Sequence, residues 1–161
     1  MALELKTAVI AGRPRVFLSG DIIEGSRFDA LSAQLPAGAA LDVSGVRRIN
    51  SYGVMRWMEF VQGRAEAGVP FVLERCSPAF VAQLNMVAGF DGGMPVGSVL
   101  TPYFCATCDE EQLADLELTG SQAVTVAASL PCPRCGESME FDDLTDTYLA
   151  FDLRRRMGAV Q

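Results

Sequence analysis

The sequence predicts an α/β protein with a mixed sheet and helices, followed by a small β module. Over residues 1–93, short apolar segments bounded by glycine or proline alternate with segments whose apolar residues recur at helical spacing. This alternation is typical of a sheet whose strands are joined by helical crossovers. Residues 94–161 carry two C-x-x-C motifs instead. We therefore predict one domain over residues 1–93 and a second over residues 94–161.

A β-hairpin and a helix are predicted at the start of the chain. Residues 3–10 and 15–18 have the composition of strands, and residues 11–14 between them contain the glycine and proline of a turn. Ser26 to Asp29 has the form of a capping box, and the apolar residues after it recur at helical spacing. The sequence thus predicts a hairpin and then a helix over residues 26–35.

Two buried strands and a capped helix are expected further along. Residues 40–43 and 70–74 are short apolar segments next to glycine or proline, which favours strands over helices. After them, Ser77 can cap a helix in which Pro78 takes the first position. With the helix between these two strands, described next, the chain up to residue 93 has four predicted strands and three predicted helices.

The clearest helical pattern lies between these two strands. Asn50 or Ser51 can cap it, and an apolar stripe that includes Trp57 recurs along it at helical spacing. We expect Trp57 in the core. Three residues lie off the stripe and are expected on the surface: Tyr52, Met55 and Arg56.

Charge and composition narrow the possible functions. The formal net charge is −7, and residues 97–161 hold eleven acidic and four basic side chains, whereas residues 1–96 hold nine of each. An acidic tail repels phosphate backbones, so nucleic-acid binding is disfavoured. The chain has no histidine, which excludes imidazole catalysis and histidine-ligated metal. A lone acidic residue, Asp42, follows a predicted strand and has no catalytic companion nearby.

The N-terminal sequence and the hydropathy pattern predict a cytoplasmic protein. No stretch approaches the roughly 18 consecutive apolar residues of a membrane span, and the first residues lack the layout of a signal peptide. Disulfides are uncommon in a reducing cytosol, so the five cysteines require another explanation.

Four of the cysteines form two C-x-x-C motifs separated by 23 residues, and this spacing predicts a structural metal site. The predicted ligands are Cys105, Cys108, Cys132 and Cys135. One zinc ion per chain is the expected occupant; iron in a rubredoxin-type site and a redox dithiol pair are the alternatives. The C-P-R-C-G motif and its flanking segments resemble a zinc ribbon, with strands expected over residues 122–130 and 148–153. Cys76 stands apart and is expected to be a small buried residue.

The segment L-D-V-S-G-V-R-R-I-N-S-Y-G-V, residues 41–54, resembles the central motif of STAS domains, the family of anti-sigma-factor antagonists. The likeness extends over roughly residues 5–90 and includes the Ser77-Pro78 pair. Asn50 stands where the family has aspartate, and Tyr52 stands where the family has a second serine or threonine.

This resemblance implies a small α/β domain that binds a protein partner, an anti-sigma factor or a serine-kinase-like protein, around the start of the second helix. Ser51 matches the family's hydroxyl and is either a phosphosite or a helix N-cap. The expected partner contacts are Asn50, Ser51, Tyr52, Met55 and Arg56.

The sequence therefore predicts a non-enzymatic, bacterial-type regulatory protein with a structural zinc ribbon. Two alternatives stay open. The chain could be the STAS accessory subunit of a transporter ATPase, or a zinc ribbon that binds nucleic acid.

Overall fold

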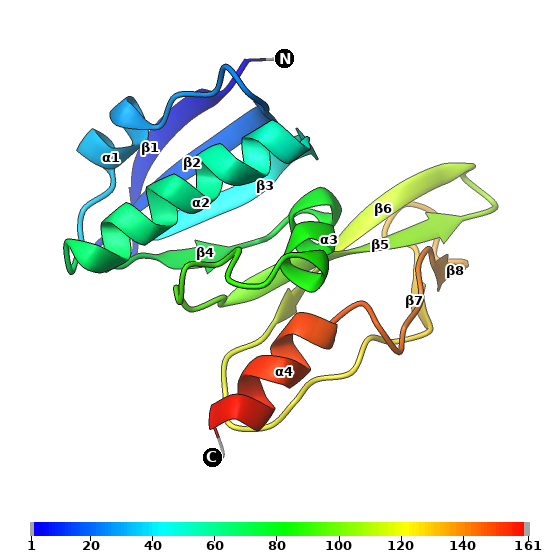
Figure 1. Cartoon of the computed structure of the whole chain (residues 1–161). Coiled ribbons are helices and arrows are strands. Elements are labelled where there is room, and N and C mark those ends of the chain that lie inside the picture. The colour runs from blue at the N-terminus through cyan, green and yellow to red at the C-terminus, as the bar shows by residue number, and fades with distance from the viewer. Residues whose placement is uncertain (1, 160–161) are drawn as a thin grey trace.

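The computed structural model describes residues 2–159, in which four helices and two four-stranded sheets form a mixed α/β protein (Figure 1). The predicted α/β class is confirmed at this level. In chain order the elements are β1 (Glu4–Ile10), β2 (Arg13–Ile22), α1 (Asp29–Gln34), β3 (Ala40–Ile49), α2 (Ser51–Glu66), β4 (Val72–Glu74), α3 (Pro78–Met86), β5 (Ser98–Cys105), β6 (Glu110–Glu117), β7 (Ser129–Pro131), β8 (Ser138–Phe141) and α4 (Ala150–Ala159). Among the described residues, no helix has both the length and the apolar character needed to cross a lipid bilayer.

The first sheet has the order β1-β2-β3-β4, with β1 antiparallel to β2 and the other neighbours parallel. The predicted four-residue turn between β1 and β2 is wrong, because only Ala11 and Gly12 form it. Their φ angles of 53° and 77° fit a two-residue hairpin turn, which continues the right-handed twist of the flanking strands. Arg13 and Pro14 consequently belong to β2.

The predicted capping box at Ser26 is also wrong. The Ser26 hydroxyl accepts a hydrogen bond from the Ile23 amide at 2.8 Å, so it closes the loop before the helix and does not cap it. Helix α1 begins only at Asp29, and no side chain caps it. A serine hydroxyl can bond either to nearby loop backbone or to the first amides of a helix, and here Ser26 bonds to the loop.

The core lies between the first sheet and its helices, and Trp57 is at its centre. The Trp57 side chain is fully buried, as predicted, and its indole N–H donates to the Phe90 carbonyl at 2.8 Å. Five phenylalanine rings surround the indole at centroid distances of 5.3–6.4 Å: Phe28, Phe60, Phe71, Phe80 and Phe90. Burial of the polar indole nitrogen is therefore compensated by a hydrogen bond.

Helix α2 begins at Ser51, and Asn50 caps it by accepting a hydrogen bond from the Gly53 amide at 2.8 Å. The alternative prediction that Ser51 is the cap is wrong. Gly53 itself permits the close packing of α2 on β2, because a Cβ there would lie 2.0 Å from the Ile22 carbonyl oxygen. The predicted cap of α3 is confirmed, since the Ser77 hydroxyl accepts from the Phe80 amide at 3.2 Å.

Strand β5 connects the first sheet to the second. Its first residues run beside the end of β4, where the Cys76 amide donates to Ser98 and the Leu100 amide donates to Cys76. Farther along, β5 lies between β6 and β8 in the second sheet, whose order is β6-β5-β8-β7. The predicted boundary after residue 93 stays a prediction, although backbone hydrogen bonds cross it.

Much of the tail differs from expectation. Only residues 129 and 130 of the predicted 122–130 strand are in a strand, and the predicted strand over residues 148–153 is wrong because helix α4 begins at Ala150. The Tyr148 hydroxyl donates to the buried Leu100 carbonyl at 2.6 Å, so this segment packs against β5 without pairing with it.

Two glycines of α2 form a matched pair for a stability test. Gly53→Ala should lower the free energy of unfolding by about 1–3 kcal/mol or more, because the added methyl meets rigid backbone. Gly63→Ala should instead raise it by about 0.5–1 kcal/mol, because no atom lies within 4 Å of the new Cβ and alanine favours helix. Urea unfolding of both variants measures the difference; equal stabilities would show that α2 does not pack on β2 as described.

Candidate metal centre

Two hairpin loops position the four predicted cysteine ligands. Cys105 ends β5 and Cys108 lies in the turn before β6, while Cys132 follows β7 and Cys135 lies in the turn before β8. The loops meet because β5 pairs with β8 through Phe104 and Glu140. Strand pairing therefore brings together two motifs that are far apart in the sequence.

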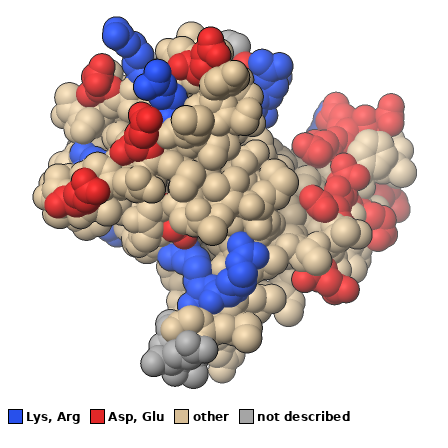
Figure 2. Space-filling view, viewed as in Figure 1, with Lys and Arg blue, Asp and Glu red and all other residues tan. Residues whose placement is uncertain are grey.

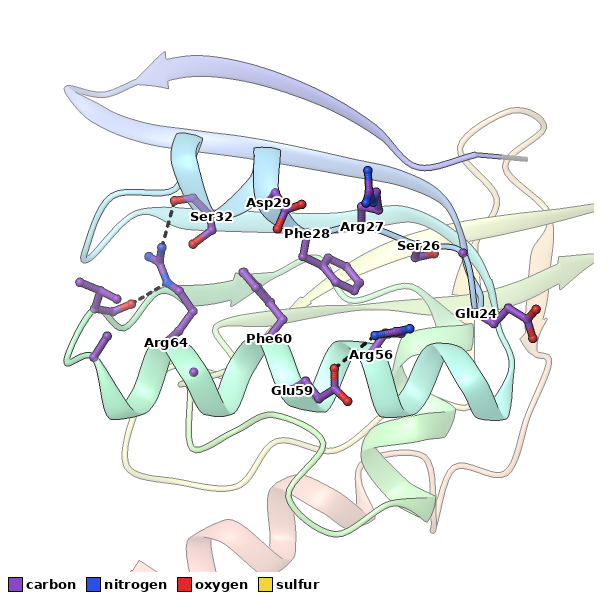
Figure 3. A pocket seen from close by; sticks show the side chains of 14 residues that line it. Glu24, Ser26, Arg27, Phe28, Asp29, Ser32, Arg56, Glu59, Phe60 and Arg64 are labelled. Atoms are coloured by element: carbon purple, nitrogen blue, oxygen red, sulfur yellow. Dashed lines mark hydrogen bonds and ion pairs between the residues drawn. The ribbon is translucent and has the colours of Figure 1, made fainter.

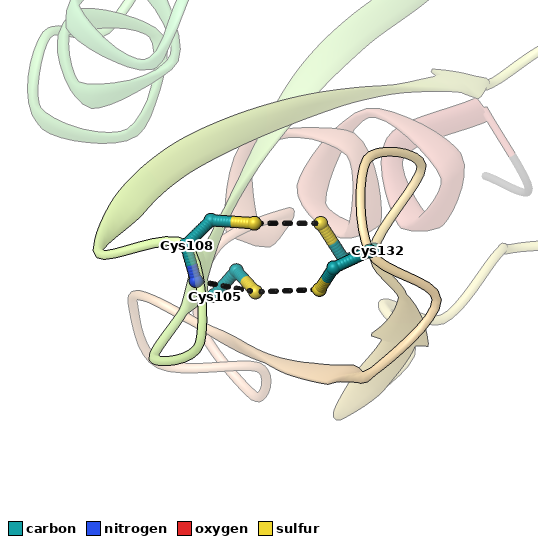
Figure 4. A group of neighbouring side chains, drawn as sticks. Cys105, Cys108 and Cys132 are labelled. Carbon is teal, nitrogen blue, oxygen red and sulfur yellow. Dashed lines mark hydrogen bonds between the residues drawn. The ribbon is translucent and has the colours of Figure 1, made fainter.

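The four Sγ atoms all lie within 4.8 Å of one another, and the three labelled thiols in Figure 4 converge on one small volume. The Cys105 and Cys135 sulfurs are 3.5 Å apart, and those of Cys108 and Cys132 are 3.9 Å apart. A tetrahedral ion with metal–sulfur bonds of about 2.3 Å requires sulfur–sulfur distances of about 3.8 Å. The residues present thus fit a single metal ion.

Backbone amides favour negative charge at Cys132. The amides of Cys135 and Arg134 donate toward its sulfur, the latter at 3.4 Å, and they lower the pKa of Cys132 to about 7. The thiol of Cys108 hydrogen-bonds to Cys135 and is partly desolvated, which raises the pKa of Cys108 to about 12. Four adjacent thiols cannot all ionise without a cation, and a bound metal ion supplies that positive charge.

Two of the cysteines belong to a small buried apolar cluster, which supports the metal centre. Cys105 and Cys132 are buried together with Tyr103 and Met139, and the Tyr103 hydroxyl donates to the Ala127 carbonyl at 2.7 Å. Outside the cluster, Arg134 from the second loop forms an ion pair with Glu110, the first residue of β6. The sequence did not predict this pair, because the two residues are far apart in the chain and have no spacing that marks them as partners.

Comparison with known proteins adds no family assignment. No family model matches the chain, and a search of curated proteins finds no matching relative. The functional argument therefore depends on the geometry of the sites.

The predicted partner residues form a second candidate site, at the N-terminal end of α2. The side chains of Tyr52 and Met55 are 59% and 62% exposed, as predicted, and Ser51 is exposed as well. Arg56 is exposed and forms an ion pair with Glu59 at 3.6 Å. Of the five predicted residues, Asn50 serves mainly as the helix cap.

A groove adjoins this face between α2 and the loop that follows β2 (Figure 3). It comprises two depressions of about 650 and 470 Å³. Tyr52, Met55 and Arg56 line the smaller one. Glu24 in the loop after β2 and Glu59 in α2 line both depressions, and neither was predicted, because only the fold brings the loop beside the helix.

The buried Asp42 carboxylate is paired with nearby cations and a backbone amide, as expected of a structural residue. Its side chain is 1% exposed and accepts hydrogen bonds from Arg15 and from the Ser44 amide, each at 2.9 Å. Arg75 approaches the same carboxylate at 3.5 Å. Two cations and an amide therefore compensate the burial of this charge.

Metal content tests the cysteine site. We expect one metal ion per chain after purification without chelator, and substantially less in Cys132→Ser, because a hydroxyl is a poor replacement for one of four thiolates. Cys76→Ala is the matched control, since Cys76 is buried outside the cluster and should not affect metal content. Elemental analysis measures all three proteins, and equal metal content in the parent and Cys132→Ser would contradict the site.

Metal affinity should depend on pH. Protons compete with the metal for the thiolates, so affinity should fall as pH falls, and it should fall most steeply below the Cys132 pKa of about 7, where the thiols are protonated. Each unit below that value should weaken apparent affinity by more than about tenfold. Chelator competition at several pH values measures this, and a pH-independent affinity would show that the ligands are not these thiols.

Proposed function

We propose that this chain is a non-enzymatic regulatory protein that binds a protein partner through the N-terminal end of α2 and holds a structural zinc ion in a ribbon-like second module. The observation that carries the partner proposal is the position of the STAS-like motif. Its residues form nearly all of β3, the Asn50 cap and the first turn of α2, and the start of this helix exposes Ser51, Tyr52 and Met55 beside a groove.

The order of elements supports the STAS resemblance. A hairpin is followed by alternating helices and parallel strands, and Gly53 of the motif allows α2 to approach the end of β2 closely. The first turn of α2 is thereby fixed relative to the sheet. A fixed helix end is suited to recognition, because little backbone ordering remains to oppose binding.

Zinc is proposed over iron because a closed set of four thiolates, with no open coordination position, is typical of structural zinc. The two hairpin loops and their small core support a ribbon-like module that depends on the ion for stability. Elemental analysis and the visible spectrum distinguish the two metals. A colourless protein containing one equivalent of zinc is expected, whereas iron would give a coloured one.

Surface charge favours a protein partner over nucleic acid. Figure 2 shows acidic side chains gathered on the side of the molecule that carries the second sheet. The exposed acids next to the cysteine loops include Asp109, Glu110, Glu111, Glu137 and Glu140. A four-thiolate zinc site adds a formal charge of −2, so phosphate backbones would be repelled from this surface.

A capture experiment from the source organism tests the partner face. The parent protein as bait should retain an anti-sigma factor or a serine-kinase-like protein, and Ser51→Asp and Met55→Glu should lose it, because each puts negative charge on the proposed contact surface. Ser51→Ala should retain binding and cost less than about 0.5 kcal/mol of stability, because Asn50 is the cap.

The matched control is Met86→Glu, which changes a side chain that is 70% exposed at the end of α3. It should retain the partner at the parent's level. Equal retention by all baits would reject this face, and capture of a transporter ATPase would favour the accessory-subunit alternative.

A further inference from the structure

We propose that the free edge of β1 pairs with the same edge of a second copy of this chain, which gives a closed homodimer. Strand β1 is the outer strand of the first sheet, and within residues 2–159 no strand pairs with its other side. Six of its seven residues are exposed, among them Val9 at 73% and Ile10 at 52%. A regular, unpaired strand edge of this length is a template for pairing with another chain.

The hairpin turn determines which backbone groups of β1 are available. In a two-residue hairpin the flanking residues, Ile10 and Arg13, form a hydrogen-bonded pair, and the pattern alternates from there along the strands. Leu5, Thr7 and Val9 consequently direct their N–H and C=O groups away from β2. Pro14 fits this alternating pattern. It lies opposite Val9 in a non-hydrogen-bonded pair, where the missing amide hydrogen of proline breaks no bond between β1 and β2.

These outward groups are symmetric about Thr7. A two-fold axis beside Thr7 places it opposite its own copy and places Leu5 opposite Val9 of the second copy. Each such pair exchanges two backbone hydrogen bonds, so every outward donor meets an acceptor. An antiparallel partner related by a two-fold axis is the arrangement of an isologous dimer interface.

The side chains are compatible with this register. Leu5 is opposite Leu18 and Thr7 is opposite Val16, so the odd-numbered residues of β1 lie on the helix-covered face of the sheet. Exposed Val9 would pack beside half-buried Leu5 of the second copy. On the other face Glu4 meets Ile10 and Lys6 meets Ala8, so no like charges are directly opposite.

The other strand edges are protected, so assembly stops at two copies; outer strand β7, for example, has only three residues and ends with Pro131. The β4 edge of the first sheet is already occupied, because Leu73 bonds to Pro95 and Gly97. In the second sheet the outer strand β6 carries Glu110, Glu111, Asp115 and Glu117, which would repel a second β6. Strand β1 has one acid, one base, no proline and a regular seven-residue register, and it lacks such protection.

Light scattering after size exclusion tests the dimer. The parent chain should have a mass of twice 17.3 kDa in solution, and Thr7→Pro should be a monomer across the same concentration series. Proline removes an outward amide and leaves the bonds to β2 intact, because Thr7 donates none to that strand. Thr7→Ala is the matched control and should remain dimeric, because it keeps the amide.

A second variant keeps the test decisive if Thr7→Pro does not fold. Val9→Glu changes a side chain that is exposed in the single chain, so the fold should persist, and the dimer dissociation constant should rise by about tenfold or more. A monomeric parent would overturn the proposal. A dimer that neither Thr7→Pro nor Val9→Glu weakens would also overturn it, because the interface would then lie elsewhere.

Discussion

The structure depends on strand β5, which lies in the second sheet and bridges to the chain segment that leaves the first sheet after β4. Its first residues are hydrogen-bonded to the chain around Cys76, directly after β4, and its last residue is Cys105 of the metal centre. The cysteine loops are thus attached to the α/β sheet by a continuous strand, without a flexible linker. The C-terminal segment strengthens this connection, because Tyr148, just before α4, donates to the Leu100 carbonyl, and Asn85 of α3 accepts from the Phe151 amide in α4.

The Arg75 side chain also links the two sheets, through ion pairs with one residue of each. It has a φ of 48°, which directs the chain from β4 toward α3, and its side chain reaches Asp115 on β6 at 2.8 Å and Asp42 on β3 at 3.5 Å. The hydrogen bond to Asp115 is the main reason that the pKa of Arg75 is raised. The pair with Asp115 is exposed and contributes little stability by itself, whereas the buried Asp42 carboxylate needs both Arg15 and Arg75 to offset its desolvation.

The sequence predicted features that depend on local chemistry. The cysteine motifs, the Ser77-Pro78 helix start and the buried Trp57 stripe follow from residues close together in the chain, and the structure contains all three.

Features decided by tertiary contacts were missed. The apolar residues at 148–153 fit a strand or a helix equally well over so short a span, and packing against β5 and α3 selects the helix. The β6 strand was missed because its acidic side chains and exposed Leu113 obscure the alternation of strand residues.

Asn50 caps α2 at the position where the STAS motif that this segment resembles has aspartate. Asparagine and aspartate can both offer a side-chain oxygen to the Gly53 amide, so Asn50 caps the helix without adding a negative charge. The first turn of α2 contains no acidic residue, and its unpaired amides provide positive potential. A phosphate on exposed Ser51 would therefore meet less repulsion here than beside an aspartate. For the proposed phosphosite, the uncharged Asn50 is therefore compatible with a phosphate on Ser51, and exposed Tyr52 belongs to the proposed contact surface.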